Sequence, residues 1–167
     1  MTGNKTNQQE GMTLIEMLVS LVVLTVGLIP IFSVIVSSSN LATRAKNNLI
    51  AANLAQEGIE VVRAIRDKAW LEGVPYDRDL SNGDYLVSWN SSTLTPYDSE
   101  AYLKFDSNSG LYSLVAGIDT IFKRKISVLK VVSACNCEVS VTSAVTWSER
   151  GQNKSVTVED HLFDWNR

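Results

Sequence analysis

The sequence predicts an α+β fold in which a long N-terminal helix packs on a C-terminal antiparallel β-sheet. First, the apolar run 14–36 carries one charged residue, Glu16, and has about the ~20 residues that a helix needs to cross a bilayer. Second, an amphipathic helical pattern follows it over residues 40–68. Third, much of the segment 69–167 alternates apolar and polar residues, as strands with one buried face do. The 167 residues suffice for one domain plus an anchor.

Residues 1–11 are predicted to be a polar leader that ends at Gly11. Its only charged side chains are Lys5 and Glu10. The apolar run behind it is longer than the core of about 7–15 residues in a secretory signal peptide. Two alternatives stay open, namely signal-peptide removal near Ser37-Ser38-Ser39 and an uncleaved signal anchor. Lys5 and the terminal amine favour a cytoplasmic leader.

Residues 12–39 are predicted to form a hydrophobic transmembrane helix. A carboxylate at mid-membrane depth costs roughly 2.5–3.5 kcal/mol, and less near the interface. Glu16 therefore calls for a partner, and the free amine of a chain cut after Gly11 would be one. Pro30 removes a backbone hydrogen bond and is expected to kink or loosen the helix before it.

Residues 40–68 are predicted to continue the helix as an amphipathic segment that ends near residues 67–70. Its two faces differ in polarity along the whole segment. The expected apolar face is Leu41, Ala45, Ala52, Ala55, Ile59 and Val62, and the expected polar face is Arg44, Asn47, Glu57, Glu60 and Arg63.

Residues 69–167 are predicted to form an antiparallel β-sheet head domain. A loop at 106–110 that closes on Gly110 indicates a hairpin, and the last three strands indicate a meander. Lys123, Arg124 and Lys125 are expected on a solvated face or as guards against edge pairing. The expected strands are 85–89, 101–105, 111–114, 122–132, 139–148 and 155–165.

Composition argues against catalysis and against nucleic-acid binding. The net charge is −3, so the chain has no basic footprint. Asp77, Asp79, Asn82 and Asp84 suggest a calcium loop, but they lack the glycine and glutamate of an EF-hand, and turn formation is the favoured interpretation. We therefore expect no metal site, no cofactor and no catalytic residue.

The cysteines and the histidine point to structural roles. Cys135 and Cys137 are separated by one residue and are expected at a hairpin tip, where a local disulfide, free thiols or an intersubunit bond are all open. The sequence offers no candidate nucleophile to act with His161 on the last predicted strand, so a structural role is favoured for this histidine.

Gly11-Met12-Thr13-Leu14-Ile15-Glu16, with the apolar run behind it, resembles the leader and N-terminal helix of type IV pilins and pseudopilins. The run through Val26-Gly27-Leu28 is most similar to PilV-type minor pilins and I-type minor pseudopilins. Trp147-Ser148-Glu149-Arg150-Gly151 and Val156-Thr157-Val158 resemble the last hairpin of PilV-like proteins. The resemblance implies a pilin-like fold and a minor subunit of a type IV pilus or a type II secretion filament.

By this resemblance, a prepilin peptidase/methyltransferase would cut after Gly11 and methylate the amine of Met12. Glu16 would then pair with the N-terminus of a neighbouring subunit. The precursor would cross the inner membrane once with its head extracytoplasmic, and would join other pilin subunits through the inner-membrane assembly platform, at the cell surface or in the periplasm. Three departures from common major pilins are Met12 in place of Phe, Ser33 in place of a helix-breaking Pro, and the close cysteine spacing.

The rival interpretation is a signal-anchored extracytoplasmic binding or sensor domain that is not cleaved. In that case Glu16 is incidental, and residues 1–11 stay on the chain.

Overall fold

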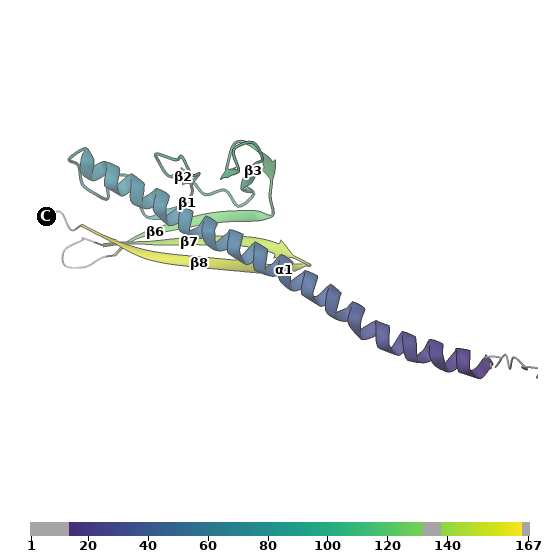
Figure 1. Cartoon of the computed structure of the whole chain (residues 1–167). Coiled ribbons are helices and arrows are strands. Elements are labelled where there is room, and N and C mark those ends of the chain that lie inside the picture. Colours follow the sequence, from purple (N-terminus) through teal and green to yellow (C-terminus); the bar gives the residue numbers. More distant parts are fainter. Residues whose placement is uncertain (1–13, 132–137, 165–167) are drawn as a thin grey trace, which may run out of the picture. The chain divides into compact units, whose positions relative to one another are not determined.

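The computed structural model describes residues 14–131 and 138–164. Within them the chain forms one long helix, α1 (Leu14–Leu71), followed by eight strands, as Figure 1 shows. The chain divides into an N-terminal unit, residues 1–45, and a C-terminal unit, residues 46–167. The predicted α+β fold, with a long N-terminal apolar helix and antiparallel sheets, is confirmed.

The strands form two antiparallel sheets. The larger sheet has the order β2-β1-β6-β7-β8 and the smaller has the order β4-β3-β5. The strands are β1 (Gly83–Leu86), β2 (Thr95–Pro96), β3 (Lys104–Asp106), β4 (Leu111–Ser113), β5 (Ile118–Asp119), β6 (Phe122–Val131), β7 (Glu138–Glu149) and β8 (Gln152–Phe163).

The β6-β7-β8 meander is confirmed and forms the framework of the larger sheet. Buried and partly exposed residues alternate along β6 and β7, because successive side chains of a strand point to opposite faces. β6 pairs with β7 without interruption, beginning with Phe122 opposite Trp147. β7 pairs with β8 without interruption up to Glu149 opposite Gln152, next to the connecting turn. Arg150 and Gly151 form the turn between β7 and β8 with φ of 54° and 74°. Two positive φ values match the type I′ turn that suits twisted hairpins.

Two predicted strands have wrong limits, and the one expected at 101–105 is β3, which spans Lys104–Asp106. The strand expected at 85–89 is β1, which ends at Leu86. Beyond it the backbone bonds to side chains instead of to a strand, because Val87 O accepts from Arg124 and Ser88 N donates to Ser91 Oγ at 2.8 Å. The predicted 106–110 hairpin is present as β3 and β4, and β5 pairs with β3 as a third strand that the sequence pattern did not indicate.

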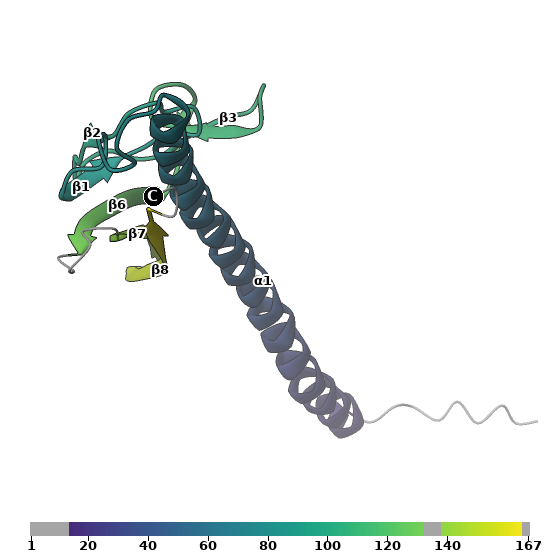
Figure 2. The same ribbon diagram turned by 90° about the vertical axis from the view of Figure 1, so that its left-hand side faces the viewer.

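From residue 46 onward α1 lies along one face of the larger sheet, and the two views in Figures 1 and 2 agree on this. The buried positions recur every three or four residues, as one helix face requires. They are Ala51, Leu54, Ala55, Gly58, Ile59, Val61, Val62, Ile65 and Ala69. Leu41 and Ala45, the first two residues of the predicted apolar face, precede these buried positions and are exposed.

The helix ends at Leu71, slightly later than predicted. Gly73 has a φ of +69°, Gly73 N donates to Trp70 O, and Val74 N donates to Ala69 O. This is the Schellman pattern of a helix C-terminus, in which a glycine adopts the left-handed conformation. Pro30 lies inside α1 and does not end it.

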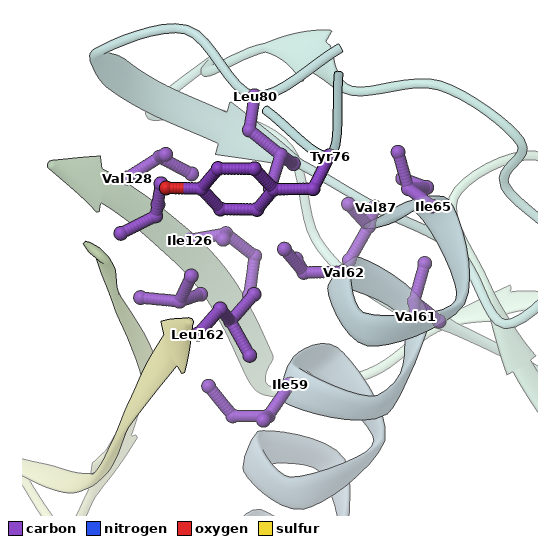
Figure 3. Packing of buried hydrophobic residues seen from close by; sticks show 12 residues of the cluster. Ile59, Val61, Val62, Ile65, Tyr76, Leu80, Val87, Ile126, Val128 and Leu162 are labelled. Atoms are coloured by element: carbon purple, nitrogen blue, oxygen red, sulfur yellow. The ribbon is translucent and has the colours of Figure 1, made fainter. Parts of the chain in front are cut away.

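The hydrophobic core of the C-terminal unit lies between α1 and the larger sheet. Figure 3 shows Ile59 and Val62 of α1 directed toward Ile126 and Leu162 of the sheet, with Tyr76 and Leu80 closing over them. A second cluster continues the core around Leu54, Leu103, Phe122 and Trp147.

Candidate functional site

The apolar part of α1 is the first candidate site. From Leu14 to Val36 its large apolar side chains are 42–79% exposed. In the described part of the chain α1 is the helix that is long and apolar enough to cross a membrane, judged by length and composition alone. Such a continuous apolar surface marks a segment made for lipid or for other helices.

Glu16 lies in the first turn of α1 and is exposed. Glu16 is the only charged side chain of the helix before Arg44. Among residues 14–131 and 138–164, none gives the Glu16 carboxylate a hydrogen bond or an ion pair. Gly11 and Met12, the predicted cleavage and methylation residues, lie outside the described residues. The pairing, cleavage and methylation roles therefore stay predictions, as do the domain limits at residues 11, 39 and 68.

The acidic side chains of the loop before β1 form ion pairs with different partners. Asp77 pairs with Lys130 at 2.7 Å, and Asp79 pairs with Arg78 at 2.7 Å. In the described part of the chain, no three His, Cys, Asp or Glu side chains form a group that could hold a metal ion.

Asp84 joins β1 to β6 through its carboxylate. Ser127 Oγ donates to Asp84 Oδ1 at 2.6 Å, and Lys125 Nζ lies 3.2 Å from Asp84 Oδ2. The Ser127 hydrogen bond, assisted by Lys125, lowers the pKa of Asp84.

Arg124 corrects the prediction that residues 123–125 form a solvated or edge-guarding face. Its side chain is 1% exposed. One guanidinium nitrogen donates to Leu54 O at 2.8 Å and to Glu57 Oε1 at 2.9 Å, and the other donates to Val87 O at 2.7 Å. Arg124 thus ties α1, the segment after β1 and β6 together.

The sequence contained the signal for Arg124. Positions 122, 124, 126 and 128 share one strand phase, and the other three are large apolar residues. The alternation of side chains along a strand, taken by itself, predicts that Arg124 lies on the buried face. The run of three consecutive cations favours a solvated group instead, and for Arg124 that interpretation is wrong. Burial lowers the pKa of Arg124, and the Glu57 carboxylate opposes that shift.

His161 lies on β8, opposite Ser140 of β7. Its Nδ1 is 2.6 Å from Glu138 Oε1, and its Nε2 is 3.6 Å from Glu159 Oε1. The contact with Glu138 joins β8 to β7, whereas Glu159 lies on β8 itself, so both contacts suit the structural role predicted for the histidine. Cys135 and Cys137 lie outside the described residues, and their pairing stays open.

Comparison with known proteins matches one family model. The prokaryotic N-terminal methylation motif matches residues 6–32, which include the predicted cleavage site, Glu16 and most of the apolar segment. The chain thus carries a type IV pilin-like processing motif at its N-terminus. No curated protein and no solved structure matches the chain.

Proposed function

We propose that this chain is a minor pilin or pseudopilin subunit that works by assembly into a filament and not by catalysis. The observation that carries the proposal is the methylation motif at residues 6–32, which overlaps an exposed apolar helix with one carboxylate. A helix of this kind is stable in lipid before assembly. In a filament, the helices of other subunits replace the lipid.

A prepilin peptidase/methyltransferase is the proposed first partner. It cuts the precursor after Gly11 and methylates the amine of Met12. Cleavage removes the polar leader and creates a cationic amine next to the apolar segment. That amine supplies the opposite charge that Glu16 lacks among the described residues, and such pairing is how charges inside a membrane are usually accommodated.

The partner of the Glu16 carboxylate is the amine of a neighbouring subunit. The first turn of a helix also favours a carboxylate, because the helix dipole is positive there. The precursor is a single-pass inner-membrane protein with its C-terminal unit extracytoplasmic. Other pilin or pseudopilin subunits and the assembly platform are its later partners. The close cysteine spacing supports a minor rather than a major subunit, of either a type IV pilus or a type II secretion filament.

Glu16→Ala tests the assembly role. We expect the variant to fold, insert and lose its leader, but to be depleted from sheared filaments when compared with the wild-type chain. Glu10→Ala is the matched control, since this carboxylate leaves with the leader and its loss should not reduce incorporation. Wild-type incorporation of Glu16→Ala would exclude the pairing role. Gly11→Val should instead block processing and keep the full-length precursor on a gel.

A further inference from the structure

The connection between β1 and β6 is far longer than the pairing of these strands requires. The two strands are antiparallel neighbours in the larger sheet, with Gly83 opposite Val128. Such neighbours can be joined by a hairpin loop of about 2–5 residues, whereas this connection, here called the insert, runs from residue 87 to residue 121. The insert contributes β2 to the larger sheet and forms all of the smaller sheet (Figure 1). Long connections on a rigid framework commonly carry a binding site.

The insert forms a hollow with a volume of about 440 Å³, here called the insert pocket. Three stretches line it, namely residues 88–91 after β1, Thr95 of β2, and the β3-β4 hairpin with the bend that follows it. The described residues of α1 and of the β6-β7-β8 meander do not line it. The volume lies in the range of about 300–1,000 Å³ that is typical of ligand pockets.

Part of the lining is apolar and open to solvent. Trp89, Leu111 and Val115 are 49%, 40% and 86% exposed. Exposed apolar side chains that gather at one place among polar groups mark a binding site. Trp89 offers a large flat face and an indole N–H, so it can contact the C–H groups of a ligand and also donate one hydrogen bond.

The rest of the lining is polar, and two of its side chains lack internal partners. No described residue hydrogen-bonds to the side chain of Asn90 or of Thr95, and both residues are exposed. An amide and a hydroxyl group offer both donors and acceptors. The two side chains are therefore available to a ligand in the pocket.

Asp106 adds a fixed negative charge to the lining. Asn108 N donates to Asp106 Oδ1 at 2.9 Å, and Ser109 Oγ donates to Asp106 Oδ2 at 2.8 Å. These hydrogen bonds lower the pKa of Asp106, so its carboxylate is ionised at neutral pH. A carboxylate has about four acceptor positions. Each oxygen thus keeps an acceptor position for a hydroxyl group of a ligand.

The chemistry of the lining favours a neutral saccharide. Among the described residues that line the pocket none is cationic, so Asp106 would repel an anionic ligand. A quaternary ammonium ligand is usually held by a cage of aromatic rings, and Trp89 is the one aromatic side chain among these residues. A sugar ring fits both parts of the lining, because its C–H face suits Trp89 and the hydroxyl groups at its edge suit Asp106 and Asn90.

We propose that the insert pocket binds a neutral sugar ring, which lies against Trp89 and donates hydroxyl hydrogen bonds to Asp106, while Asn90 and Thr95 complete the contacts. The ring is the end of a glycan or one unit of a polysaccharide, since both present the same chemistry. The inference goes beyond the proposed function, which concerns α1 and its processing. Cleavage after Gly11 is measured separately on a gel, so failure of either assay leaves the other intact.

Saturation-transfer NMR tests the proposal with the full chain in micelles of lauryldimethylamine oxide, a detergent without a sugar. The probes are the methyl glycosides of glucose, galactose, mannose and N-acetylglucosamine. We expect saturation transfer to the ring C–H protons of at least one of them. Glucuronate should bind more weakly than methyl glucoside, and tetramethylammonium should not bind. Absence of transfer to every glycoside, or transfer to tetramethylammonium alone, would overturn the proposal.

The length of the preferred saccharide distinguishes its source. Cellobiose and diacetylchitobiose each present two linked rings. A gain in affinity from the methyl glycoside to the corresponding disaccharide assigns the pocket to a polysaccharide, whereas equal affinity assigns it to the terminal sugar of a glycan.

Substitutions assign the binding to the insert pocket. Trp89→Ala should weaken it about tenfold, and Asn90→Ala about fivefold through one lost hydrogen bond. Asn90→Ala removes no internal hydrogen bond among the described residues, so its thermal unfolding should match that of the wild-type chain, and it tests the pocket even where Asp106→Asn loosens the β3-β4 loop. Asp119→Asn and Ile118→Ala are the matched controls, since both residues are exposed on the insert and neither lines the pocket. Wild-type affinity in both Trp89→Ala and Asn90→Ala, or an equal loss of affinity in the controls, would overturn the proposal.

Discussion

The Arg124 guanidinium lies 2.9 Å from the Glu57 carboxylate and joins the middle of the sheet to the helix that covers it. Arg124 is 1% exposed, whereas the Glu57 side chain is 32% exposed. The buried charge thus depends on one carboxylate and on the carbonyl groups of Leu54 and Val87. Arginine suits this position because its guanidinium stays charged and offers several donors at once.

Arg124→Ala should lower the free energy of unfolding of the C-terminal unit by about 3–5 kcal/mol. The change leaves a cavity, removes the donors from two carbonyl groups and leaves Glu57 without its cation. Arg124→Met fills the space with an apolar side chain, so its loss should be smaller by about 2 kcal/mol. Denaturant unfolding of the full chain, followed by tryptophan fluorescence, measures both values. Equal losses in the two variants would show that the ion pair, and not the filled volume, carries the stability.

Gly58→Ala should destabilise the C-terminal unit even though alanine favours helices. An added Cβ would lie 2.6 Å from Ser143 Oγ and 2.8 Å from Ile126 Cδ1, side chains of the sheet that packs on α1. Overpacking costs about 1–3 kcal/mol, while the gain in helix propensity is about 1 kcal/mol. We therefore expect a net loss of roughly 1 kcal/mol in denaturant unfolding.

Ser143→Ala is the partner change for that experiment. The Ser143 hydroxyl is buried and no described residue hydrogen-bonds to it. Its removal should cost little and should recover much of the loss in the double variant Gly58→Ala/Ser143→Ala. Gly27→Ala, with nothing within 4 Å of the added Cβ, is the control that should leave the C-terminal unit unchanged. Additive effects of Gly58→Ala and Ser143→Ala would contradict the predicted steric contact.

Asp84 should make the C-terminal unit less stable in acid. Its pKa in the folded chain is below the value of about 3.9 expected when unfolded, so its stabilising effect is present above that pH. The stabilisation falls as the pH drops through the folded pKa, because the unfolded chain takes up the proton first. Thermal unfolding midpoints from pH 7 to pH 2 should show a smaller acid dependence for Asp84→Asn than for the wild-type chain. Ser127→Ala should reduce the dependence in the same direction, and parallel curves for all three chains would contradict this role of Asp84.

Alternation predicted the meander because its three strands each have one buried face. Val139, Val141 and Val145 alternate with polar residues along β7, so sequence phase and burial agree there. β5 escaped prediction because two residues are too few to show alternation. It pairs with β3 after a bend at residues 114–117, which Ser113 Oγ holds by accepting from Ala116 N and donating to Ala116 O. The helix was predicted because apolar residues recur every three or four positions, but periodicity could not show that burial begins at Ala51.

The N-terminal site was predicted from its chemistry, whereas the contacts of the C-terminal unit were not. A carboxylate in an apolar run, here Glu16, indicates that a partner is needed, whatever fold the rest of the chain adopts. Arg124 and Glu57 are 67 residues apart. Their pairing exists only after α1 packs on β6, so no local pattern could reveal it.

The mass of the intact mature chain, purified from the membrane or from filaments of its own host, tests the central claim most directly. We predict a chain that begins at Met12, lacks residues 1–11 and carries one additional methyl group on its N-terminal amine. Fragmentation of the N-terminal peptide places that methyl group. A chain that retains residues 1–11, or one cut near Ser39, would contradict the account and favour a signal-anchored or secreted domain.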